Sequence, residues 1–564
     1  DDEGIYINPD KKVGLVNRRL AIIDLSPLGH MPMSYGTLQV TDSESLMTRR
    51  GSSFKDFARY RITYNGEIYN FQDARKKLES GGYKFKSKSD TEVILSLYDK
   101  YGVDCLKHLR GMFAFAIYDT KKETLFLARD RMGKKPLKYF FKNEVFIFAS
   151  ELKAILTQKE VEKSPDWIAI HHYLTYGYVP APMTGFTDIN KLEPGHYLLL
   201  DLKNRKLTKT CYWKPDFSEK LYLSEAEWSE RLLATLEESV KLRMIADVPI
   251  GAFLSGGVDS STVVALMSKV SKKPVKTFTI GFKDQLNDER SYAERISKLY
   301  KTDHTTLIAE AEAIEEFLPS LVYQYEEPYA DSSAIVTYMV CKLARKHVTV
   351  ALTGDGGDEN FAGYDHRMKR LERDVFLNDF LKFARPFGIP ISANLSRVSN
   401  SKLIKRVNKF LEKSKMDLAD RYVTYNCLFE NQDKKALYLN KLNELSANID
   451  SYEIARNKFS ESDTEDPQDA ALYFDLTSWL PDSQLAKVDI ASMSASLEAR
   501  SPFLDQDIVE LASKMPFDLK VHGNEYKYIL KKTVEKIVPR ENLYRKKMGF
   551  TIPLGSWFTG NLNG

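Results

Sequence analysis

One short run of residues does most to limit what this chain can fold into. Residues 255–261 read Ser-Gly-Gly-Val-Asp-Ser-Ser and lie between a buried strand predicted over 248–254 and a helix predicted over 260–270. A glycine-rich turn between a strand and a helix presents backbone amides and the positive end of the helix dipole, which favours an anion. Asp259 fits such a site if a cation such as Mg²⁺ accompanies a polyphosphate. The alternative is a plain turn with Asp259 as helix cap, and this run alone favours neither.

A second acidic loop has the same setting and favours a metal–nucleotide site. Residues 353–359 read Thr-Gly-Asp-Gly-Gly-Asp-Glu and directly follow a buried strand predicted over 348–352. Acids so close together are costly unless a metal–nucleotide complex or a substrate amine neutralises them, and a solvated acidic turn is the plain alternative. No Gly-x4-Gly-Lys-Ser/Thr motif occurs, which excludes the phosphate loop of kinases and GTPases.

The pattern around these loops predicts an α/β fold for the second part of the chain. Alternating strands and helices favour a parallel, doubly wound sheet, whose ligands bind at the carboxyl ends of its strands. Both loops are therefore expected in one crevice. Ser291 and Glu294 have the spacing of a helix capping box. The further elements predicted here are a strand over 275–281 and helices over 291–300 and 334–346.

The first 200 or so residues are strand-rich instead. A loop is expected over 34–61, and a charged linker from Pro215 to about Glu227 predicts a domain boundary near Pro215. The polar, helical stretch 371–464 suggests no chemistry. Strands are predicted for the apolar runs at 20–23, 113–118, 124–128, 145–148 and, as the last of them, 197–200.

Composition limits the classes of function. The 82 Lys and Arg residues against 78 acids give a net charge of +4, too near neutral to indicate a nucleic-acid or membrane surface. No apolar run reaches the roughly 18–20 residues of a membrane helix, and the opening residues do not resemble a signal peptide. The four cysteines are scattered without Cys-x-x-Cys spacing, which argues against disulfides or a zinc ribbon and favours a reducing cytoplasm.

A polar stretch in the strand-rich part has the residues needed to handle an amide. The side chain of Asn65 and the backbone amide of Gly66 can both donate hydrogen bonds to a developing oxyanion. Glu67 and Asp90 are expected to hold the α-amino group of an amino acid, and Arg19 to clamp its α-carboxylate. Taken alone, Asn65-Gly66 is more typical of a hairpin turn.

Taken together, the motifs of the second part resemble a known family. Ser-Gly-Gly-x-Asp-Ser after a strand is similar to the pyrophosphatase loop of N-type ATP-pyrophosphatases. With the second acidic loop and the segment 489–505, this loop resembles the glutamine-hydrolysing asparagine synthetases. Lys527 matches the lysine that contacts pyrophosphate in that family, and 547–550 matches a further signature.

The first part resembles the class II, N-terminal-nucleophile glutaminase domain of the same family. The resemblance implies an α+β domain with an αββα sandwich over 1–213. For 214–564 it implies an α/β doubly wound ATP-pyrophosphatase domain with a helical C-terminal part. The matching motifs are Arg19–Asp24, Asn65–Asn70, Ser89–Glu92, Arg129–Leu137 and Ser150–Lys153.

The resemblance also implies an activity. The carboxylate of aspartate attacks ATP to give a β-aspartyl-adenylate and pyrophosphate, and ammonia from glutamine travels through the protein to displace AMP. Mg²⁺ is the implied cofactor and ATP a substrate. The implied partners are small molecules only, without nucleic acid or membrane. Whether the protein forms a homodimer stays open.

Particular residues receive roles through this resemblance. Asp259 and Asp358 are the implied metal ligands, Lys527 stabilises the departing pyrophosphate, and Asp355 faces the acceptor. The implied residues of the glutaminase reaction are Asn65 and Gly66, and those of glutamine binding are Arg19, Asn65, Gly66, Glu67 and Asp90. The implied ATP-binding residues are Phe253, Leu254, Ser255, Gly256, Gly257, Asp259, Ser260, Ile280, Thr353 and Gly354.

Three departures from the family pattern affect these expectations, and one of them is the extra length at 34–61. The nucleophile of the family is a cysteine at the exposed N-terminus, whereas the first cysteine here is Cys105. The opening residues match a segment several tens of residues into such proteins, so the nucleophile is expected outside the printed sequence. Asp355 stands where the family often has Glu, which puts the identity of the acceptor acid in question.

Two rival functions remain. The first keeps the adenylation but changes the acceptor to a sugar or peptide acid, or closes a β-lactam or lasso ring. Retention of Arg19, Asn65, Glu67 and Asp90 favours a true glutaminase over a ring-closing relative, which has no use for a glutamine pocket. The second rival is a nucleotide-sensing or tRNA-thiolating protein, and the near-neutral charge and lack of a cysteine pair argue against thiolation.

Overall fold

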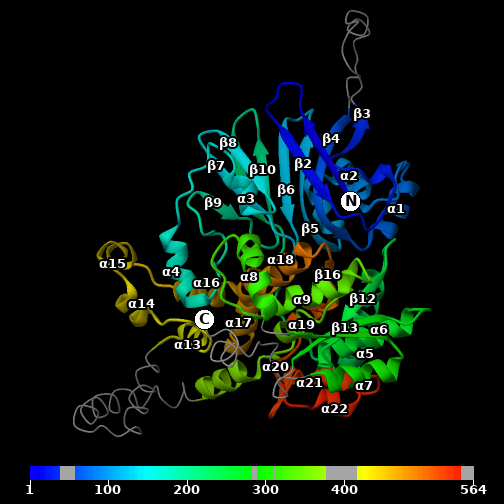
Figure 1. Cartoon of the computed structure of the whole chain (residues 1–564), viewed down its shortest axis with the longest axis vertical. Coiled ribbons are helices and arrows are strands. Elements are labelled where there is room, and N and C mark those ends of the chain that lie inside the picture. The colour runs from blue at the N-terminus through cyan, green and yellow to red at the C-terminus, as the bar shows by residue number, and fades with distance from the viewer. Residues whose placement is uncertain (38–57, 283–288, 310–311, 377–415, 548–564) are drawn as a thin grey trace, which may run out of the picture.

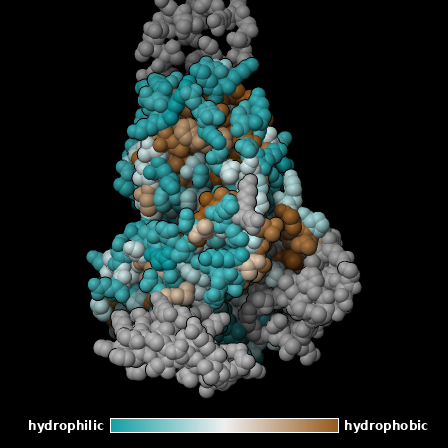
Figure 2. Space-filling view, turned by 90° about the vertical axis from the view of Figure 1, so that its left-hand side faces the viewer, coloured by the Kyte–Doolittle hydropathy of each residue, from teal (hydrophilic) through white to brown (hydrophobic). Residues whose placement is uncertain are grey.

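The computed structural model describes residues 1–37, 58–282, 289–309, 312–376 and 416–547 (Figure 1). A strand-rich part extends to β11 (Lys206–Cys211), and a mixed helix–sheet part follows it. Within the described residues, no helix is long and apolar enough to span a bilayer. On the face drawn in Figure 2, hydrophilic residues cover most of the described surface.

The first part is built on a six-stranded antiparallel sheet, with the order β11-β10-β6-β5-β4-β3. Two small sheets accompany it: the hairpin of β1 (Asp2–Ile7) and β2 (Gly14–Arg19), and β8-β7-β9, formed by Val145–Ala149, Lys138–Lys142 and Ile189–Lys191. The large sheet contains β3 (Met33–Thr37), β4 (Ala58–Ile68), β5 (Gly111–Asp119), β6 (Thr124–Arg129), β10 (His196–Asp201) and β11 (Lys206–Cys211).

Both faces of this sheet are buried, which explains why its strands read as continuous apolar runs. Along β5, Phe115 and Ile117 pack with helices, while Ala114 and Ala116 contact the opposite cluster around Leu15. Side chains of a strand alternate between faces, so each face receives every second residue. The helices of this part are α1 (Phe71–Ser80), α2 (Asp90–Tyr101), α3 (Leu152–Leu156) and α4 (Trp167–Tyr176), with 3-10 turns at Pro27–Gly29 and Gly102–His108.

Several local predictions for this part are wrong. The run 20–23 is no strand, because β2 ends at Arg19 and the run is apolar for core burial of Ile22 and Ile23. Asn65 and Gly66 lie inside β4 rather than in a hairpin turn. The strand at 197–200 is followed by β11, so it is not the last. Of the predicted loop 34–61, the two ends belong to β3 and β4, and 38–57 lies outside the described residues.

The second part contains the predicted parallel sheet. Its strand order is β14-β13-β12-β15-β16, and all four strand pairs are parallel. The chain builds β12, β13 and β14 in one direction, then returns to add β15 and β16 on the other side. The order therefore reverses between β12 and β15, which is where such sheets bind ligands. The strands are β12 (Ile250–Phe253), β13 (Lys276–Phe282), β14 (Asp303–Ala309), β15 (Val350–Leu352) and β16 (Glu498–Arg500).

Helices cover both faces of this sheet (Figure 1). One face packs on α5 (Glu225–Arg243), α6 (Val258–Val270), α7 (Arg290–Tyr300) and α21 (Tyr528–Val534), and the other on α8 (Glu312–Tyr325) and α9 (Ser333–Arg345). The capping box predicted for Ser291 and Glu294 is wrong: α7 starts at Arg290, Glu289 is its N-cap residue, and no side chain caps it. A real capping box, Ser224 with Glu227, starts α5.

A helical layer completes the chain and packs against the first part through Tyr176 and Tyr178. The remaining elements are α10 (Gly357–Asn360), α13 (Leu418–Thr424), α14 (Asn431–Leu437), α15 (Asn440–Ser446), α16 (Glu453–Glu461), α17 (Pro467–Phe474), a π-helix at Asp475–Leu485, α18 (Ala486–Ser494), a 3-10 turn at Pro502–Leu504, α19 (Gln506–Ser513), α20 (Phe517–Lys520), β17 (Val521–His522), β18 (Glu525–Tyr526) and α22 (Arg540–Leu543).

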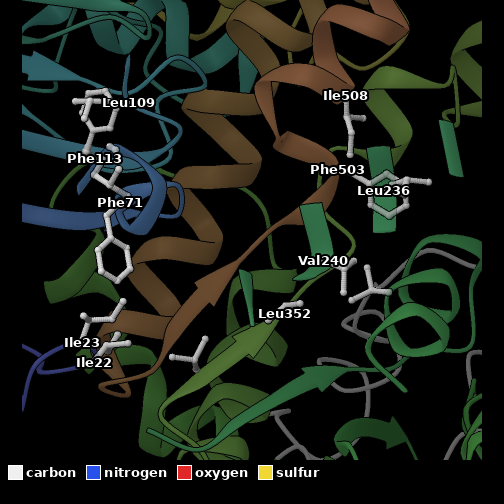
Figure 3. Close-up of a cluster of buried hydrophobic side chains, with 14 of the residues drawn as sticks. Ile22, Ile23, Phe71, Leu109, Phe113, Leu236, Val240, Leu352, Phe503 and Ile508 are labelled. Atoms are coloured by element: carbon white, nitrogen blue, oxygen red, sulfur yellow. The ribbon is translucent and has the colours of Figure 1, made fainter. Parts of the chain in front are cut away.

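The two parts share one apolar core. Figure 3 shows Phe71, Leu109 and Phe113 of the first part and Leu236 and Phe503 of the second within a single cluster of buried side chains. Because the hydrophobic effect scales with the apolar area removed from water, this shared cluster holds the two parts together. Sites in the two parts are therefore kept in a fixed relation.

Candidate functional site

The two glycine-bearing loops meet on one lysine. The first loop connects β12 to α6 and the second connects β15 to α10, on neighbouring strands. The ammonium of Lys527 lies 2.5 Å from Oδ2 of Asp259 and 2.6 Å from Oδ1 of Asp358. Lys547 also donates to Oδ1 of Asp358, at 2.8 Å. Two carboxylates and two ammonium groups thus gather where the order of the sheet reverses.

The backbone of both loops is fitted to this contact. A Cβ atom on Gly354 would lie 2.8 Å from Cβ of Asp259, and one on Gly357 would lie 2.5 Å from Oδ1 of Asp259. Gly256 has a φ of +73°, a conformation that side chains disfavour. Lys527 adopts a φ of +56° without being glycine, immediately before α21. Non-glycine residues held in this region store strain, which is typical of functional sites.

The charged side chains that meet at the two loops shift one another's pKa values. Burial raises the pKa of Asp358, but the charges of Lys527 and Lys547 outweigh it, and the pKa falls well below its ordinary value. Burial opposes the charge of Lys527, but Asp259 and Asp358 raise its pKa above the usual range. Asp358 and Lys527 are therefore ionised near neutral pH, whereas burial raises the pKa of Asp259 and the charge of Lys527 opposes that shift.

The first loop has unpaired groups that could bind an anion and a cation. No side chain caps the start of α6, so its first backbone N–H groups stay available for a negatively charged group. The hydroxyls of Ser255 and Ser260 lie 3.1 Å apart beside them. Oδ1 of Asp259 is buried without a hydrogen-bond partner among the described residues. A buried unpaired carboxylate oxygen is costly unless a ligand meets it, so these residues fit a divalent cation with a phosphate.

The other expected nucleotide-binding residues lie on the same or the adjacent strand. Phe253 is half-buried at the end of β12, and Leu254 follows it, buried, with its N–H donating to the carbonyl of Phe278. Ile280 is buried in β13. Thr353 donates from its hydroxyl to Oδ2 of Asp355 at 2.6 Å. Among the described His, Cys, Asp and Glu residues, no group of three has the arrangement of a metal site, so a cation here would rely on the two aspartates and the phosphates.

All five residues expected to bind glutamine line one cavity in the first part. Its volume is about 70 Å³. Asn65, Gly66 and Glu67 come from β4, while Asp90 is the first residue of α2. Met493 and Glu498 close it from the second part. The residues shared with the expected set are Arg19, Asn65, Gly66, Glu67 and Asp90.

Strand pairing explains why this wall of the cavity needs glycine. Gly66 pairs with Phe113 of β5 and has a φ of +150°, and a Cβ atom there would lie 2.1 Å from the carbonyl oxygen of Met112. Only glycine fits such an approach. Arg19 is half-buried and donates from Nη2 to the carbonyls of Ile23 and Asp24, both at 2.7 Å. This fixes its guanidinium at the rim of the cavity.

The acids of this cavity are buried and unevenly paired. Asp90 accepts hydrogen bonds from the hydroxyl of Tyr64 and the N–H of Ile68. Oε2 of Glu67 accepts from Arg500 of the second part at 2.9 Å, while Oε1 of Glu67 has no partner among the described residues. Burial and the charge of Asp90 raise the pKa of Glu67, and Arg500 opposes them. A cationic ligand group would relieve this unpaired acid.

Sequence reasoning missed residues that join the two sites. Arg500 pairs with both Glu67 and Glu498, and its backbone carbonyl accepts from Thr353 N–H. The only signal was the charged pattern Glu-Ala-Arg in the segment 489–505. Cys105, in contrast, is fully buried, and burial raises the pKa of its thiol, so it is no candidate nucleophile.

This geometry defines a class: a parallel α/β domain with two glycine-bearing acidic loops where its strand order reverses, joined to an antiparallel domain with a cavity lined by buried acids. The family comparison specifies it. The asparagine synthase family model matches residues 231–564, and the glutamine amidotransferase domain model matches 50–213. The chain belongs to the asparagine synthase family.

Relatives with assigned names support this membership. Glutamine-hydrolyzing asparagine synthetase 1 of Bacillus subtilis is 34% identical, over 100% of this chain and 83% of its own length. A putative glutamine-hydrolyzing asparagine synthetase 2 of Methanocaldococcus jannaschii is 39% identical over 72% of this chain and 78% of its own. Amidase chry2 of Gibberella zeae is 26% identical over 100% of this chain and 84% of its own.

Proposed function

We propose that this protein makes asparagine from aspartate, ATP and glutamine, and releases AMP, pyrophosphate and glutamate. The observation that carries the proposal is the meeting of the two loops on Lys527, at the point where the strand order reverses. Its second support is the cavity that collects Arg19, Asn65, Gly66, Glu67 and Asp90. A nitrogen-releasing site and a carboxylate-activating site in one chain match the chemistry of an amidotransferase.

In the synthetase part, the loops bind ATP and orient the acceptor. The uncapped start of α6 and the hydroxyls of Ser255 and Ser260 hold the phosphates, and Phe253, Leu254, Ile280, Thr353 and Gly354 line the rest of the nucleotide site. Asp259 and Asp358 would hold Mg²⁺, which when bound neutralises phosphate charge and polarises the reacting phosphorus. Lys527 stays protonated because two carboxylates raise its pKa, so it can stabilise the departing pyrophosphate.

The acceptor carboxylate attacks the α-phosphorus and displaces pyrophosphate, giving an acyl-adenylate. Asp355, half-buried beside Thr353 and Ser501, faces the α-ammonium group of the acceptor. Ammonia then attacks the acyl carbon, and AMP leaves with the electrons of the broken carbon–oxygen bond.

In the glutaminase part, the pocket binds the glutamine zwitterion. Arg19 clamps the α-carboxylate, while Glu67 and Asp90 hold the α-ammonium group, which meets the unpaired Oε1 of Glu67. Asn65 and the N–H of Gly66 stabilise the oxyanion formed at the side-chain amide. None of the described residues that line this pocket is a cysteine. We further propose that this part is an αββα N-terminal-nucleophile domain, that the domains divide at 213/214, and that the protein works in the cytoplasm.

A second candidate keeps the chemistry and changes the acceptor. Asp355 is one methylene shorter than the glutamate that the family often carries, and a relative with the name amidase aligns over the whole chain. A peptide or sugar carboxylate would then take the place of aspartate.

One assay separates the two candidates. The protein is incubated with MgATP, ammonium chloride and a panel of carboxylic acids, with separate quantification of AMP, pyrophosphate and amide. Asparagine formed with one equivalent of AMP and pyrophosphate supports the proposal. Pyrophosphate release that depends on another acid, with none from aspartate, would replace aspartate as acceptor.

A further inference from the structure

A small cavity lies between the two sites. Its volume is about 20 Å³, and both parts of the chain contribute to its walls. On one side it is lined by Met112, whose backbone contacts Gly66 of the glutamine pocket. On the other it is lined by Ser501, which follows β16 and reaches the second acidic loop. The cavity is thus adjacent to the expected place of the acceptor acid.

Four cations line this cavity, and three of them are already used. Arg110 and Arg243 both pair with Asp505, at 2.9 and 2.7 Å. Arg131 donates to the backbone carbonyls of Leu106 and Leu109. The fourth cation, Lys134, donates from its ammonium to a hydroxyl rather than to a carboxylate.

The backbone of Lys134 is held by a hydrogen bond, whereas its ammonium group uses only one of its three donors in the contacts between described residues. Its N–H donates to Oδ1 of Asp130 at 2.9 Å, inside a tight turn after β6. The residue is 94% buried, and its ammonium donates to the hydroxyl of Ser501 at 2.5 Å. An ammonium group has three donors, so two remain for another acceptor. Burial lowers the pKa of Lys134 and the charge of Asp355 opposes this, as expected for a cation that lacks a direct partner.

The opposite charge, that of Asp355, lies near the same hydroxyl. Oδ2 of Asp355 lies 3.4 Å from Oγ of Ser501. Because Lys134 and Asp355 both lie within these distances of one oxygen atom, their charged atoms are at most about 6 Å apart. A carboxylate and an ammonium group carried by one carbon atom fit between such partners at hydrogen-bond distance.

We propose that Lys134, contributed by the glutaminase part, binds the α-carboxylate of the acceptor while Asp355 binds its α-ammonium group. The pair selects an α-amino acid and leaves its side-chain carboxylate directed to ATP. This inference rests on the proposed function and deepens it, because it makes the synthetase site incomplete without the first part of the chain.

The test compares two acceptors in ammonia-driven synthesis by the full chain. Aspartate carries the α-carboxylate, whereas β-alanine keeps the amine and the carboxylate to be activated but lacks it. We expect Lys134→Met to raise KM for aspartate about 10- to 100-fold, the size of a lost hydrogen-bonded charge pair. KM for ATP and for β-alanine should be unchanged. Lys134→Gln, which keeps the bond to Ser501 without the charge, should show the same selective loss.

A matched control is Lys135→Met at the neighbouring residue. Lys135 is equally buried but pairs with Asp489 across the two parts, at 2.8 Å. Lys135→Met should lower the melting temperature, and it should change KM for aspartate and KM for β-alanine by the same factor. If Lys134→Met and Lys134→Gln also change KM for aspartate and KM for β-alanine by the same factor, Lys134 only holds the two parts together, and the inference is overturned.

Two other outcomes also decide against it. A defect confined to glutamine-driven synthesis would assign Lys134 to ammonia transfer. Unchanged kinetics in both variants would remove it from the site altogether. Failure of the proposed function has a different signature, because the wild-type protein would then release no pyrophosphate with aspartate.

Discussion

The two candidate sites neutralise their buried acids in different ways. At the loop cluster, Asp259 and Asp358 share Lys527, and Lys547 adds a second cation. In the glutamine pocket, Glu67 has a single arginine and one unpaired oxygen. The loop cluster therefore has two cations for its two carboxylates and one unpaired oxygen, on Asp259, whereas in the pocket one oxygen of Glu67 is unpaired and its single ion-pair partner, Arg500, is shared with Glu498.

This difference agrees with the ligand that we propose for each site. Lysines beside the loops suit a polyphosphate, whose oxygens can take over their hydrogen bonds. An unpaired, buried carboxylate in the pocket suits an ammonium group. In both sites the balancing cation comes from far along the chain, and for the pocket it comes from the other part of the molecule. The glutamine pocket is thus not a self-contained unit.

The largest effect is expected at the loop cluster. Asp259→Asn removes a proposed metal ligand and leaves Lys527 with one carboxylate, so pyrophosphate release should fall about 1000-fold while the fold persists. A pyrophosphate assay measures the loss of activity, and thermal melting shows whether the fold persists. Asp303→Asn, an exposed aspartate on β14, is the control and should retain full activity. Undiminished release from Asp259→Asn would show that this loop is not the metal site.

The dependence of the pocket on the other part is tested at Arg500. Arg500→Met leaves Glu67 and Glu498 buried without their counter-charge, which should cost about 3–5 kcal/mol of unfolding free energy. Chemical denaturation measures it. Arg540→Met, which breaks an exposed pair with Glu535, should cost less than about 1 kcal/mol. Equal effects of the two changes would mean that Arg500 does not support the pocket.

Arg19→Ala separates the two sites functionally. It removes the proposed clamp for the α-carboxylate, so KM for glutamine should rise about 10-fold. Ammonia-driven synthesis should not change, because Arg19 lies only in the pocket. Arg205→Ala is the control, because Arg205 is largely exposed and does not line the pocket. Equal losses with glutamine and ammonia would contradict the assignment of two separate sites.

Most of what locates the sites could be predicted from the sequence, because it depends on local pattern. The loops at 255–261 and 353–359 each follow an apolar strand, and parallel strands place such loops at one edge of a sheet. The side chains of Asn65 and Glu67 were found in the same way, from residue types next to one another.

The missing information concerns contacts between distant segments. Nothing local indicates that Arg500 pairs with Glu67, 433 residues earlier, or that Lys134 meets Ser501, 367 residues later. Local apolar pattern also misled at 20–23, where Ile22 and Ile23 are buried without strand geometry. Tertiary packing decides such cases, and a single sequence does not contain it explicitly.

The smallest effect concerns pH and tests how complete the loop cluster is. Because the pKa of Asp358 is lowered in the folded chain, its carboxylate stabilises the fold above the unfolded pKa of about 4 and loses this contribution as the pH falls through the lower folded value. Asp358→Asn should therefore cost about 1–2 kcal/mol at pH 6, and the difference from the wild type should narrow below about pH 4. Urea unfolding across this range measures it. A constant difference would mean that the two lysines do not hold the carboxylate charged, and the loop cluster would then carry the same unpaired acid as the pocket.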